Sequence, residues 1–410
     1  MPKPLFFLRS FNDIDHIVPV IWKFQEYGEK PIIVFTSKIS YEDDYRLRFI
    51  ESNGRVEMHR FLSGPWDKLR RRIASRLTEK WKVEESTIRR FLWSLRKEKR
   101  FLSKNNVYTC IFEWGDPQSR GPVTERFICA AKANRLATFS VPHGCNIYLN
   151  TLVNQRDIAL NAKGVKQDMS ARNVFDYYVV QSPRHRAQSL RMGLDPDRCQ
   201  AWGSARFYPE WQKINLKICG KFIPQKDDGG KTKVIFMLPH WDYNVHRAKC
   251  MTLIERLVNR DNIFLIIKDH TRGRTGGLTQ EERKRFEAHP NVETDVRADS
   301  PALIAWSDAV INFGSSIGIE VLLQDKVLIN PLYLHTNRTI FEETGAAVNA
   351  HNDEEVLSTL AMIGEGRGAK IPDKNRDKLY REIIYGGKEP FDVLDYYYQR
   401  LSLSVNPSAR

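Results

Sequence analysis

The sequence predicts an α/β protein of two units, each built on a parallel sheet covered by helices. Short apolar runs alternate with helical segments through both halves of the 410-residue chain, and this alternation is typical of parallel sheets. A polar stretch at 207–232, which contains Asp227-Asp228-Gly229-Gly230, interrupts the alternation. A chain of this length also suits two domains better than one. We therefore expect an N-terminal domain at 1–206, a linker at 207–232 and a C-terminal domain at 233–385.

The expected strands are short runs of apolar and β-branched residues. In the first half these strands are 5–8, 31–35, 56–61, 107–113, 136–141, 177–180 and 200–202, with helices near 14–27, 41–52, 121–135 and 183–193. In the second half the strands are 234–238, 263–268, one near 292, 309–311 and 327–329, with helices near 246–259, 279–288 and 301–306. Ligands of open α/β sheets bind at the carboxyl ends of strands, so the residues that follow each strand are the candidates for a functional site.

The composition favours a globular protein of a reducing compartment. Hydrophobic residues make up 41% of the chain and aromatic residues 11%, which excludes a largely disordered chain. No apolar run approaches the ~20 residues that span a bilayer, and the N-terminus lacks the features of a signal peptide. The six cysteines are scattered without a Cys-x-x-Cys pair, which favours free thiols. We expect a cytoplasmic location, and leave peripheral attachment to the inner face of the cytoplasmic membrane open.

The positive charge of the chain is concentrated in one segment. Of the net charge of +14, residues 60–104 hold the larger part, with 15 Lys or Arg against 5 Asp or Glu. Apolar residues recur there at helical spacing, which predicts basic amphipathic helices at 65–81 and 85–102. We interpret about 64–104 as a basic helical insertion in the N-terminal domain. It either packs on the sheet with a solvated face or attracts an anionic membrane or acidic polymer; nucleic acid is not expected, because no binding module accompanies the charge.

The most informative motif is the turn Gly314-Ser315-Ser316, which lies between the buried runs Ala309–Ile311 and Val327–Ile329. A helix that opens at these serines would present backbone N–H groups and hydroxyls with partial positive charge, which suits a phosphate or diphosphate. One turn later, Glu320 could accept hydrogen bonds from sugar hydroxyls. Serine and glycine also cap helices without binding anything. We interpret the pattern as a site for a nucleotide-linked sugar or polyol.

The longer segment Asp308–Pro331 resembles the donor-binding segment of GT-B glycosyltransferases. It is most similar to bacterial capsule-synthesis Kdo transferases and to CDP-glycerol glycerophosphotransferases. The resemblance covers mostly residues 136–345. It implies two Rossmann-like domains that face a cleft, with a C-terminal helix at 386–410 that returns to the N-terminal domain. It further implies a metal-independent transferase without a cofactor, whose donor is linked to CMP, CDP or UDP and whose acceptor is a glycan or a lipid-linked glycan.

Two strand ends in the N-terminal half carry candidate acid–base groups. His143 precedes a flexible glycine, and an imidazole in that position can accept a proton from a hydroxyl. The His-Gly pair resembles a motif of the glycerophosphotransferases, which implies that His143 is the general base; a structural turn histidine is the alternative. Glu113 and Asp116 could supply a base or orient His143, or they could cap the next helix. The segment Arg9–Asp13, after the first strand, is a further place for acceptor or phosphate contacts.

In the C-terminal half, candidate donor contacts follow the first two strands. Lys268 and His270 resemble the Lys-x-His-Pro element of the surface-polysaccharide family, which contacts the donor phosphate, although Thr271 stands where that element has proline. A lysine is a suitable point charge for a phosphate. His240 ends the preceding strand and is a further candidate for this site.

Two other histidine patterns receive no ligand assignment. His240, Asp242 and His246 have a spacing that fits no regular helical pair, and we expect no metal site. The dipeptide His289-Pro290 follows a polar helix and is interpreted as a turn.

These observations predict glycosyl transfer from a nucleotide sugar to a hydroxyl of a surface-polysaccharide or lipid-linked acceptor. Three alternatives remain. One is a CDP-polyol phosphotransferase, which would use the same phosphate-binding turn. Another is a sugar-nucleotide epimerase, which needs several acidic residues around the sugar and no acceptor. The last is a non-enzymatic protein that binds an anionic polymer or membrane.

Overall fold

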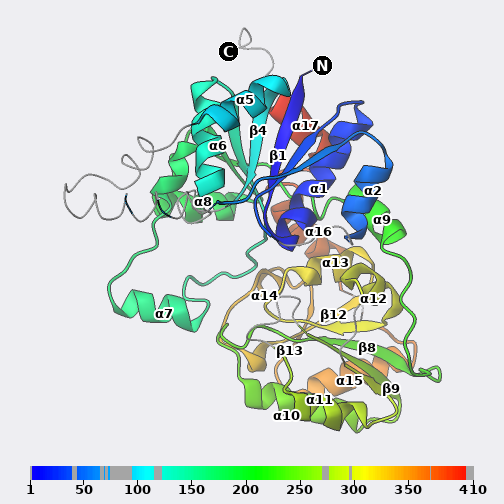
Figure 1. Cartoon of the computed structure of the whole chain (residues 1–410). Coiled ribbons are helices and arrows are strands. Elements are labelled where there is room, and N and C mark those ends of the chain that lie inside the picture. Colours follow the sequence, from blue (N-terminus) through cyan, green and yellow to red (C-terminus); the bar gives the residue numbers. More distant parts are fainter. Residues whose placement is uncertain are drawn as a thin grey trace. The chain divides into compact units, whose positions relative to one another are not determined.

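The computed structural model describes residues 2–38, 44–64, 69, 73, 95–114, 122–269, 277–294, 298–369 and 371–402. The chain folds into two compact units (Figure 1). Unit 1 comprises Met1–Cys145, Gln167–Tyr208 and Arg381–Arg410, and unit 2 comprises Asn146–Lys166 and Pro209–Tyr380. Both units are Rossmann-like α/β structures with parallel sheets, so the predicted fold class is confirmed.

Unit 1 is built on a parallel sheet that has seven strands within the described residues, in the order β3-β2-β1-β4-β5-β6-β7. The strands are β1 (Lys3–Leu8), β2 (Ile32–Phe35), β3 (Glu57–Arg60), β4 (Val107–Glu113), β5 (Ala137–Val141), β6 (Tyr177–Val180) and β7 (Cys199–Ala201). The central strands are apolar on both faces because helices cover both faces. The direction of strand addition reverses between β1 and β4, and such a switch point leaves a crevice at the carboxyl ends of the two strands.

The helices of unit 1 pack on the two faces of its sheet according to the alternation of side chains along β1. Phe6 meets Phe24 of α1 edge to face at 5.6 Å, whereas Phe7 stacks on Phe112 and meets Phe127 of α6 on the other face. The helices are α1 (Phe11–Glu26), α2 (Tyr45–Ser52), α5 (Arg96–Lys104), α6 (Pro122–Ala133), α8 (Pro183–Arg191) and α17 (Val393–Ser402).

The C-terminal helix α17 packs on unit 1. Tyr398 stacks on Tyr27 of the α1 C-terminus with 3.9 Å between ring centroids, and the Tyr397 hydroxyl donates a hydrogen bond of 3.1 Å to the carbonyl of Gly203. Gly203 has φ +87°, and a Cβ there would lie 2.1 Å from the Ile384 carbonyl oxygen. This close approach of two backbones requires glycine.

Unit 2 contains a parallel sheet of six strands in the part of the chain that is described, ordered β10-β9-β8-β11-β12-β13. The strands are β8 (Thr232–Met237), β9 (Ile263–Lys268), β10 (Val292–Glu293), β11 (Ala309–Ile311), β12 (Val327–Pro331) and β13 (Val348–Ala350). The helices are α7 (Gln155–Ala162), α9 (Pro209–Ile218), α10 (Arg247–Val258), α11 (Gln280–Glu287), α12 (Ser300–Trp306), α13 (Ile317–Leu323), α14 (Ile340–Thr344) and α15 (Asp353–Gly364), with α16 (Asp373–Ile383) leading back to unit 1. The switch point of this sheet lies between β8 and β11.

Several elements differ from the sequence-based expectation. The segment 207–232, expected as a linker, contains α9, and residues 146–166 belong to unit 2 although both flanking segments belong to unit 1. Strand β13 was not expected, because its sequence Val348-Asn349-Ala350 is not a continuous apolar run of the kind that marked the other short strands. Apart from Leu69 and Ile73, the expected helix at 65–81 falls outside the described residues, as does most of the one at 85–102, and α5 represents the end of this basic segment. None of the helices in the described part of the chain combines the length and the apolar character needed to span a bilayer.

Candidate functional site

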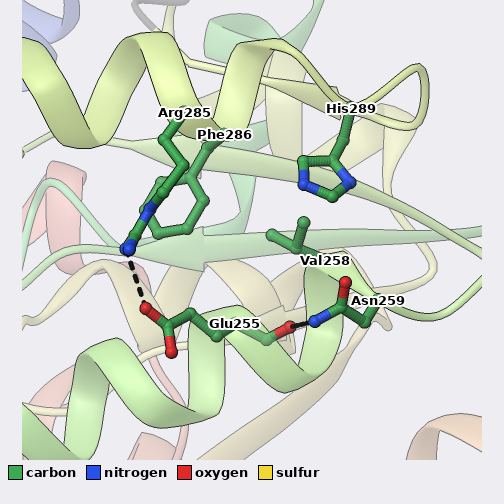
Figure 2. A pocket seen from close by; sticks show the side chains of 6 residues that line it. All are labelled: Glu255, Val258, Asn259, Arg285, Phe286 and His289. Atoms are coloured by element: carbon green, nitrogen blue, oxygen red, sulfur yellow. Dashed lines mark hydrogen bonds and ion pairs between the residues drawn. The ribbon is translucent and has the colours of Figure 1, made fainter.

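A surface pocket in unit 2 lies at the amino ends of the strands, where open α/β sheets do not bind their ligands. The pocket, with a volume of 230 Å³, is lined by α10 and α11 residues and bridged by the Arg285–Glu255 ion pair at 2.8 Å (Figure 2). Its residues Asn259 and His289 come just before β9 and β10 begin, that is, at the amino ends of the strands, whereas ligands bind at the carboxyl ends. His289 lies in a turn after α11, as the sequence suggested.

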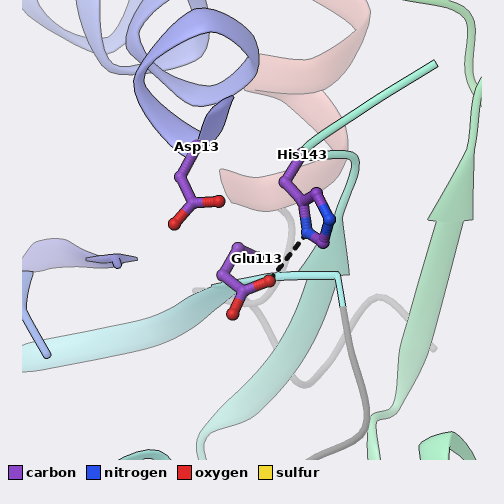
Figure 3. A group of neighbouring side chains, drawn as sticks. All are labelled: Asp13, Glu113 and His143. Atoms are coloured by element: carbon purple, nitrogen blue, oxygen red, sulfur yellow. Dashed lines mark hydrogen bonds and ion pairs between the residues drawn. The ribbon is translucent and has the colours of Figure 1, made fainter. Parts of the chain in front are cut away.

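At the switch point of unit 1, three titratable side chains come together: Asp13, Glu113 and His143 (Figure 3). Glu113 is the last residue of β4, His143 follows β5, and Asp13 lies in the first turn of α1 after β1. One ligand atom from each lies within 4.8 Å of the others, and His143 Nδ1 is 2.8 Å from Glu113 Oε2. We call these three residues the acid–base cluster.

Asp13 also fixes the start of α1. Its carboxylate accepts hydrogen bonds from the Arg9 N–H at 2.6 Å, the Ser10 N–H at 2.7 Å and the Ser10 hydroxyl at 2.8 Å. These bonds satisfy donors at the helix N-terminus and hold Asp13, which is fully buried, against Glu113. The segment Arg9–Asp13 thus contributes to the site through its aspartate, by a contact that the sequence does not reveal.

Burial shifts the ionisation of both carboxyl groups toward neutral pH. Burial raises the pKa of Glu113 to about 8, although Arg9, whose Nε lies 3.6 Å from Glu113 Oε1, opposes this shift. Burial and the neighbouring Glu113 raise the pKa of Asp13 to about 6, against the opposing effect of His143 and the hydrogen bonds from Arg9 and Ser10. Near pH 7 the cluster therefore contains a protonated glutamic acid beside an ionised aspartate, an arrangement suited to proton transfer.

The surroundings of His143 hold its ring in place. Trp114 meets the His143 ring edge to face at 6.1 Å and donates a hydrogen bond of 2.5 Å to the Val179 carbonyl. The Gln181 amide donates to the Gly144 carbonyl. The His143 side chain is 25% exposed and the Glu113 side chain only 6%, so the imidazole is the member of the cluster that a substrate can reach.

Two groups close to the cluster are kept neutral by burial. Burial, together with Arg206 and His143, lowers the pKa of His16 well below its ordinary value. Burial raises the pKa of the Cys145 thiol to about 12. Neither group is charged near pH 7. Two predicted site residues, Asp116 as an acid–base group and His270 as a contact to the donor, lie outside the described residues.

In unit 2, the predicted turn Gly314–Ser316 has a fixed backbone. Gly314 has φ +88°, and a Cβ there would lie 2.7 Å from the Tyr148 hydroxyl oxygen. That hydroxyl donates a hydrogen bond of 2.8 Å to the Gly314 carbonyl, and the Asn312 amide donates one of 2.9 Å to the Ser315 carbonyl. Ser316 makes no side-chain cap bond to α13. Both serines are half-buried, so the turn retains groups that a ligand can contact.

Further predicted contact residues lie around the ends of the strands of unit 2. Lys268 ends β9 and is half-buried, and Glu320 is buried in α13. His240 Nδ1 lies 3.6 Å from Asp242 Oδ2, and the His240 ring meets Tyr243 edge to face at 5.3 Å. Whether these residues bind a nucleotide stays a prediction.

Tyr148 is the residue of this site that sequence reasoning missed. Its ring stacks on Tyr243 at 5.7 Å, so it links the Gly314 turn to the loop after β8. The position of Tyr148 depends on the path of 146–166, which the hydrogen bond of the Leu149 N–H to the Arg338 carbonyl helps to fix. Such a nonlocal contact leaves no periodic signal in the sequence.

Among the described residues, the acid–base cluster is the group whose ligand atoms are close enough to hold a metal ion. A metal there would have to displace protons near neutral pH, since its ligands bind in their deprotonated forms. His240, Asp242 and His246, which were considered from the sequence, form no such group within the described residues.

The geometry of both units defines a protein of the GT-B-like class. No known protein family is matched by the sequence, and no curated protein matches it. Solved structures do match. They include the S. aureus MnaA–UDP complex, with 11% identity over 100% of this chain and 98% of that chain and a TM-score of 0.59. A second is a putative UDP-N-acetylglucosamine 2-epimerase from Listeria monocytogenes, with 12% identity over 99% of this chain and 97% of that chain and a TM-score of 0.60. A third is UDP-GlcNAc 2-epimerase from Neisseria meningitidis bound to UDP-GlcNAc, with 13% identity over 98% of this chain and 99% of that chain and a TM-score of 0.57.

These neighbours confirm the GT-B-like fold and correct the predicted activity. The prediction of a glycosyltransferase is wrong, because the matched structures include UDP-GlcNAc 2-epimerases, and the sugar-nucleotide epimerase considered as an alternative fits them better. They give no support to a specific kinship with Kdo transferases or CDP-glycerol glycerophosphotransferases, or to a glycan acceptor. The error has a physical cause: a turn at Gly314–Ser316 would bind the diphosphate, which is common to the substrates of transferases and epimerases.

Proposed function

We propose that the protein is a sugar-nucleotide epimerase that inverts C2 of a UDP-linked 2-acetamido sugar. The observation that carries this proposal is the acid–base cluster, in which a protonated Glu113, an ionised Asp13 and His143 meet at the switch point of unit 1. The neighbours, whose names specify UDP-GlcNAc as substrate, support the choice of sugar.

Inversion at C2 requires a proton to leave one face of the carbon and another to arrive on the opposite face. The C2–H bond has no adjacent carbonyl to acidify it. The electron pair from that bond can instead form a C1=C2 double bond while the C1–O bond breaks and UDP leaves as an anion. Re-addition of UDP at C1, with a proton delivered to the other face of C2, restores a saturated sugar and completes the epimerisation.

The cluster supplies the group for the first proton transfer. His143, the exposed member, takes the C2 proton, and the Glu113 carboxyl at its Nδ1 accepts a hydrogen bond from the imidazolium that results. Glu113 lies beside His143 and its side chain is only 6% exposed, so the proton for the opposite face of C2 comes from solvent water. Asp13 is fully buried and acts as a positioning residue whose charge and helix-capping bonds fix the other two.

Binding of the UDP moiety is assigned to unit 2. The backbone N–H groups and hydroxyls of Ser315 and Ser316, with Lys268, would stabilise the negative charge that grows on the diphosphate as it leaves. Glu320 would accept a hydrogen bond from a ribose hydroxyl.

The test is incubation of the protein with UDP-GlcNAc and no acceptor, followed by separation of the products. We expect the C2 epimer to accumulate. His143→Gln should abolish turnover yet retain stabilisation by UDP, which amounts to ~2.7 kcal/mol at ~100 times the dissociation constant. His289→Gln, a change in the surface pocket, is the matched control and should turn over normally. No epimer from a protein that UDP stabilises would overturn the proposal.

A further inference from the structure

The outer face of α5 carries a concentration of positive charge. Five cationic side chains are exposed on this helix, and we call them the basic face: Arg96, Lys97, Lys99, Arg100 and Lys104. None of them has an ion-pair partner among the residues that the structure describes. The charge of this face is therefore uncompensated within the described structure.

The inner face of α5 holds the helix firmly on unit 1. Glu98 is 2% exposed and pairs with Arg126 of α6 at 2.7 Å, and Leu102 is buried in the core. Phe101 packs edge to face against Phe61 and Phe127. Helix α5 lies beside α6 (Figure 1), so the basic face stands on a rigid support and needs no ordering to present its charges.

We propose that the basic face is a docking surface for an anionic lipid bilayer. Residues 60–104, which end in α5, hold 15 Lys or Arg against 5 Asp or Glu. Lys and Arg near an anionic membrane surface each contribute favourably, and their attraction falls off within about one Debye length, roughly 10 Å at 0.1 M salt. A compact group of charges on one rigid helix suits a two-dimensional array of headgroups.

The aromatic side chain of α5 argues against a single-stranded nucleic acid as the partner of the basic face. Proteins that bind single-stranded nucleic acids combine cations with aromatic rings on which bases stack. In α5 the aromatic ring, Phe101, points inward to Phe61 and Phe127, so the exposed surface offers point charges without a stacking platform. No helix in the described residues can span a bilayer, so binding through the basic face would be peripheral.

The experiment is co-sedimentation of the full chain with lipid vesicles. Vesicles with about one third phosphatidylserine should bind the protein, whereas vesicles of phosphatidylcholine alone should not. The variant K97E/R100E/K104E reverses three charges at helical spacing on the basic face and should bind the anionic vesicles at least about tenfold more weakly. Raising the salt concentration should also weaken binding of the unmodified protein to the anionic vesicles.

A matched control has the same change in net charge at another place. K213E/K217E/K284E reverses three exposed lysines of α9 and α11 and should keep nearly full binding. Equal loss in both variants would overturn the proposal, because net charge alone would then explain binding. Tight binding of duplex or single-stranded DNA without vesicle binding would also overturn it. The variants keep the acid–base cluster, so the outcome does not depend on the proposed epimerase activity.

Discussion

Glu113 and His143 form one unit, because Glu113 Oε2 lies 2.8 Å from His143 Nδ1 at the ends of adjacent parallel strands. The register of β4 with β5 places Glu113 beside Val141, and His143 follows two residues later. Burial of this pair keeps the Glu113 carboxyl largely protonated near pH 7. Its ionisation is therefore coupled both to the histidine that would take a proton from the substrate and to the stability of unit 1.

Glu113→Gln should raise the stability of the protein at alkaline pH. The pKa of Glu113 in the folded protein is raised from 4.5 to about 8, so the stability that the neutral carboxyl provides is present below pH 4.5 and is lost as the pH rises through about 8. The amide cannot ionise and avoids this loss, which is on the order of a few kcal/mol. Thermal unfolding should be measured at about pH 5 and about pH 9. The unfolding temperature of the variant should exceed that of the unmodified protein only at about pH 9.

Glu57→Gln is the control for that experiment and should behave oppositely. A hydrogen bond from Lys3 lowers the pKa of Glu57. Its contribution is therefore present above the ordinary pKa of a glutamate and is lost as the pH falls. This variant should be slightly less stable than the unmodified protein at about pH 9, by roughly 0–1 kcal/mol for so exposed a pair. If Glu113→Gln behaved in the same way, the raised pKa of Glu113 would be refuted.

The rate of epimerisation should follow a bell-shaped dependence on pH. The pKa of Asp13 is about 6 and the pKa of Glu113 is about 8. The cluster is therefore in its active ionisation state between about pH 6 and about pH 8. Because the two carboxyl groups interact, these limits belong to the cluster as a whole rather than to either residue. Asp13→Asn should remove or displace the acid limb of kcat/KM. A merely structural loss would lower the rate equally at all pH values and leave the limb in place.

Gly314→Ala should weaken UDP binding and destabilise unit 2. A methyl group at Gly314 would approach the Tyr148 hydroxyl to 2.7 Å, and φ +88° is unfavourable for alanine, which costs roughly 1–2 kcal/mol by itself. Tyr148→Phe removes the hydroxyl at a cost of about 1 kcal/mol for the lost hydrogen bond. The double variant should lose less free energy of unfolding than the sum of the losses in the two single variants, as measured by urea unfolding. Strict additivity would show that the Tyr148–Gly314 contact does not exist.

His335 should make the protein sensitive to acid. Its ring stacks on Phe313 at 5.5 Å, and burial, with His246 nearby, lowers its pKa from 6.5 to about 4. The neutral form stabilises the fold above pH 6.5, and this contribution is lost as the pH falls toward 4. His335→Phe keeps an aromatic ring against Phe313 and should unfold less readily in this range. The same change at the partly exposed His289 should have no such effect.

The sequence allowed the sheets and part of the site to be predicted, since these depend on local patterns. Buried runs located β4 and β5, so Glu113 and His143 could be named from their places after strands. Asp13 joins them only because β1 pairs with β4 after a long crossover, and Tyr148 reaches Gly314 through the path of 146–166. Contacts of that kind depend on topology, which local periodicity does not encode.

Hydrogen exchange at C2 of the sugar reports directly on the removal of the C2 proton by His143. The protein is incubated with UDP-GlcNAc in D₂O without an acceptor, and the C2 proton signals are followed by NMR. We expect deuterium to enter C2 as the second epimer appears, and we expect His143→Gln and Glu113→Gln to stop both while UDP still binds. Retention of the C2 proton by a protein that binds UDP would refute the proposed epimerisation.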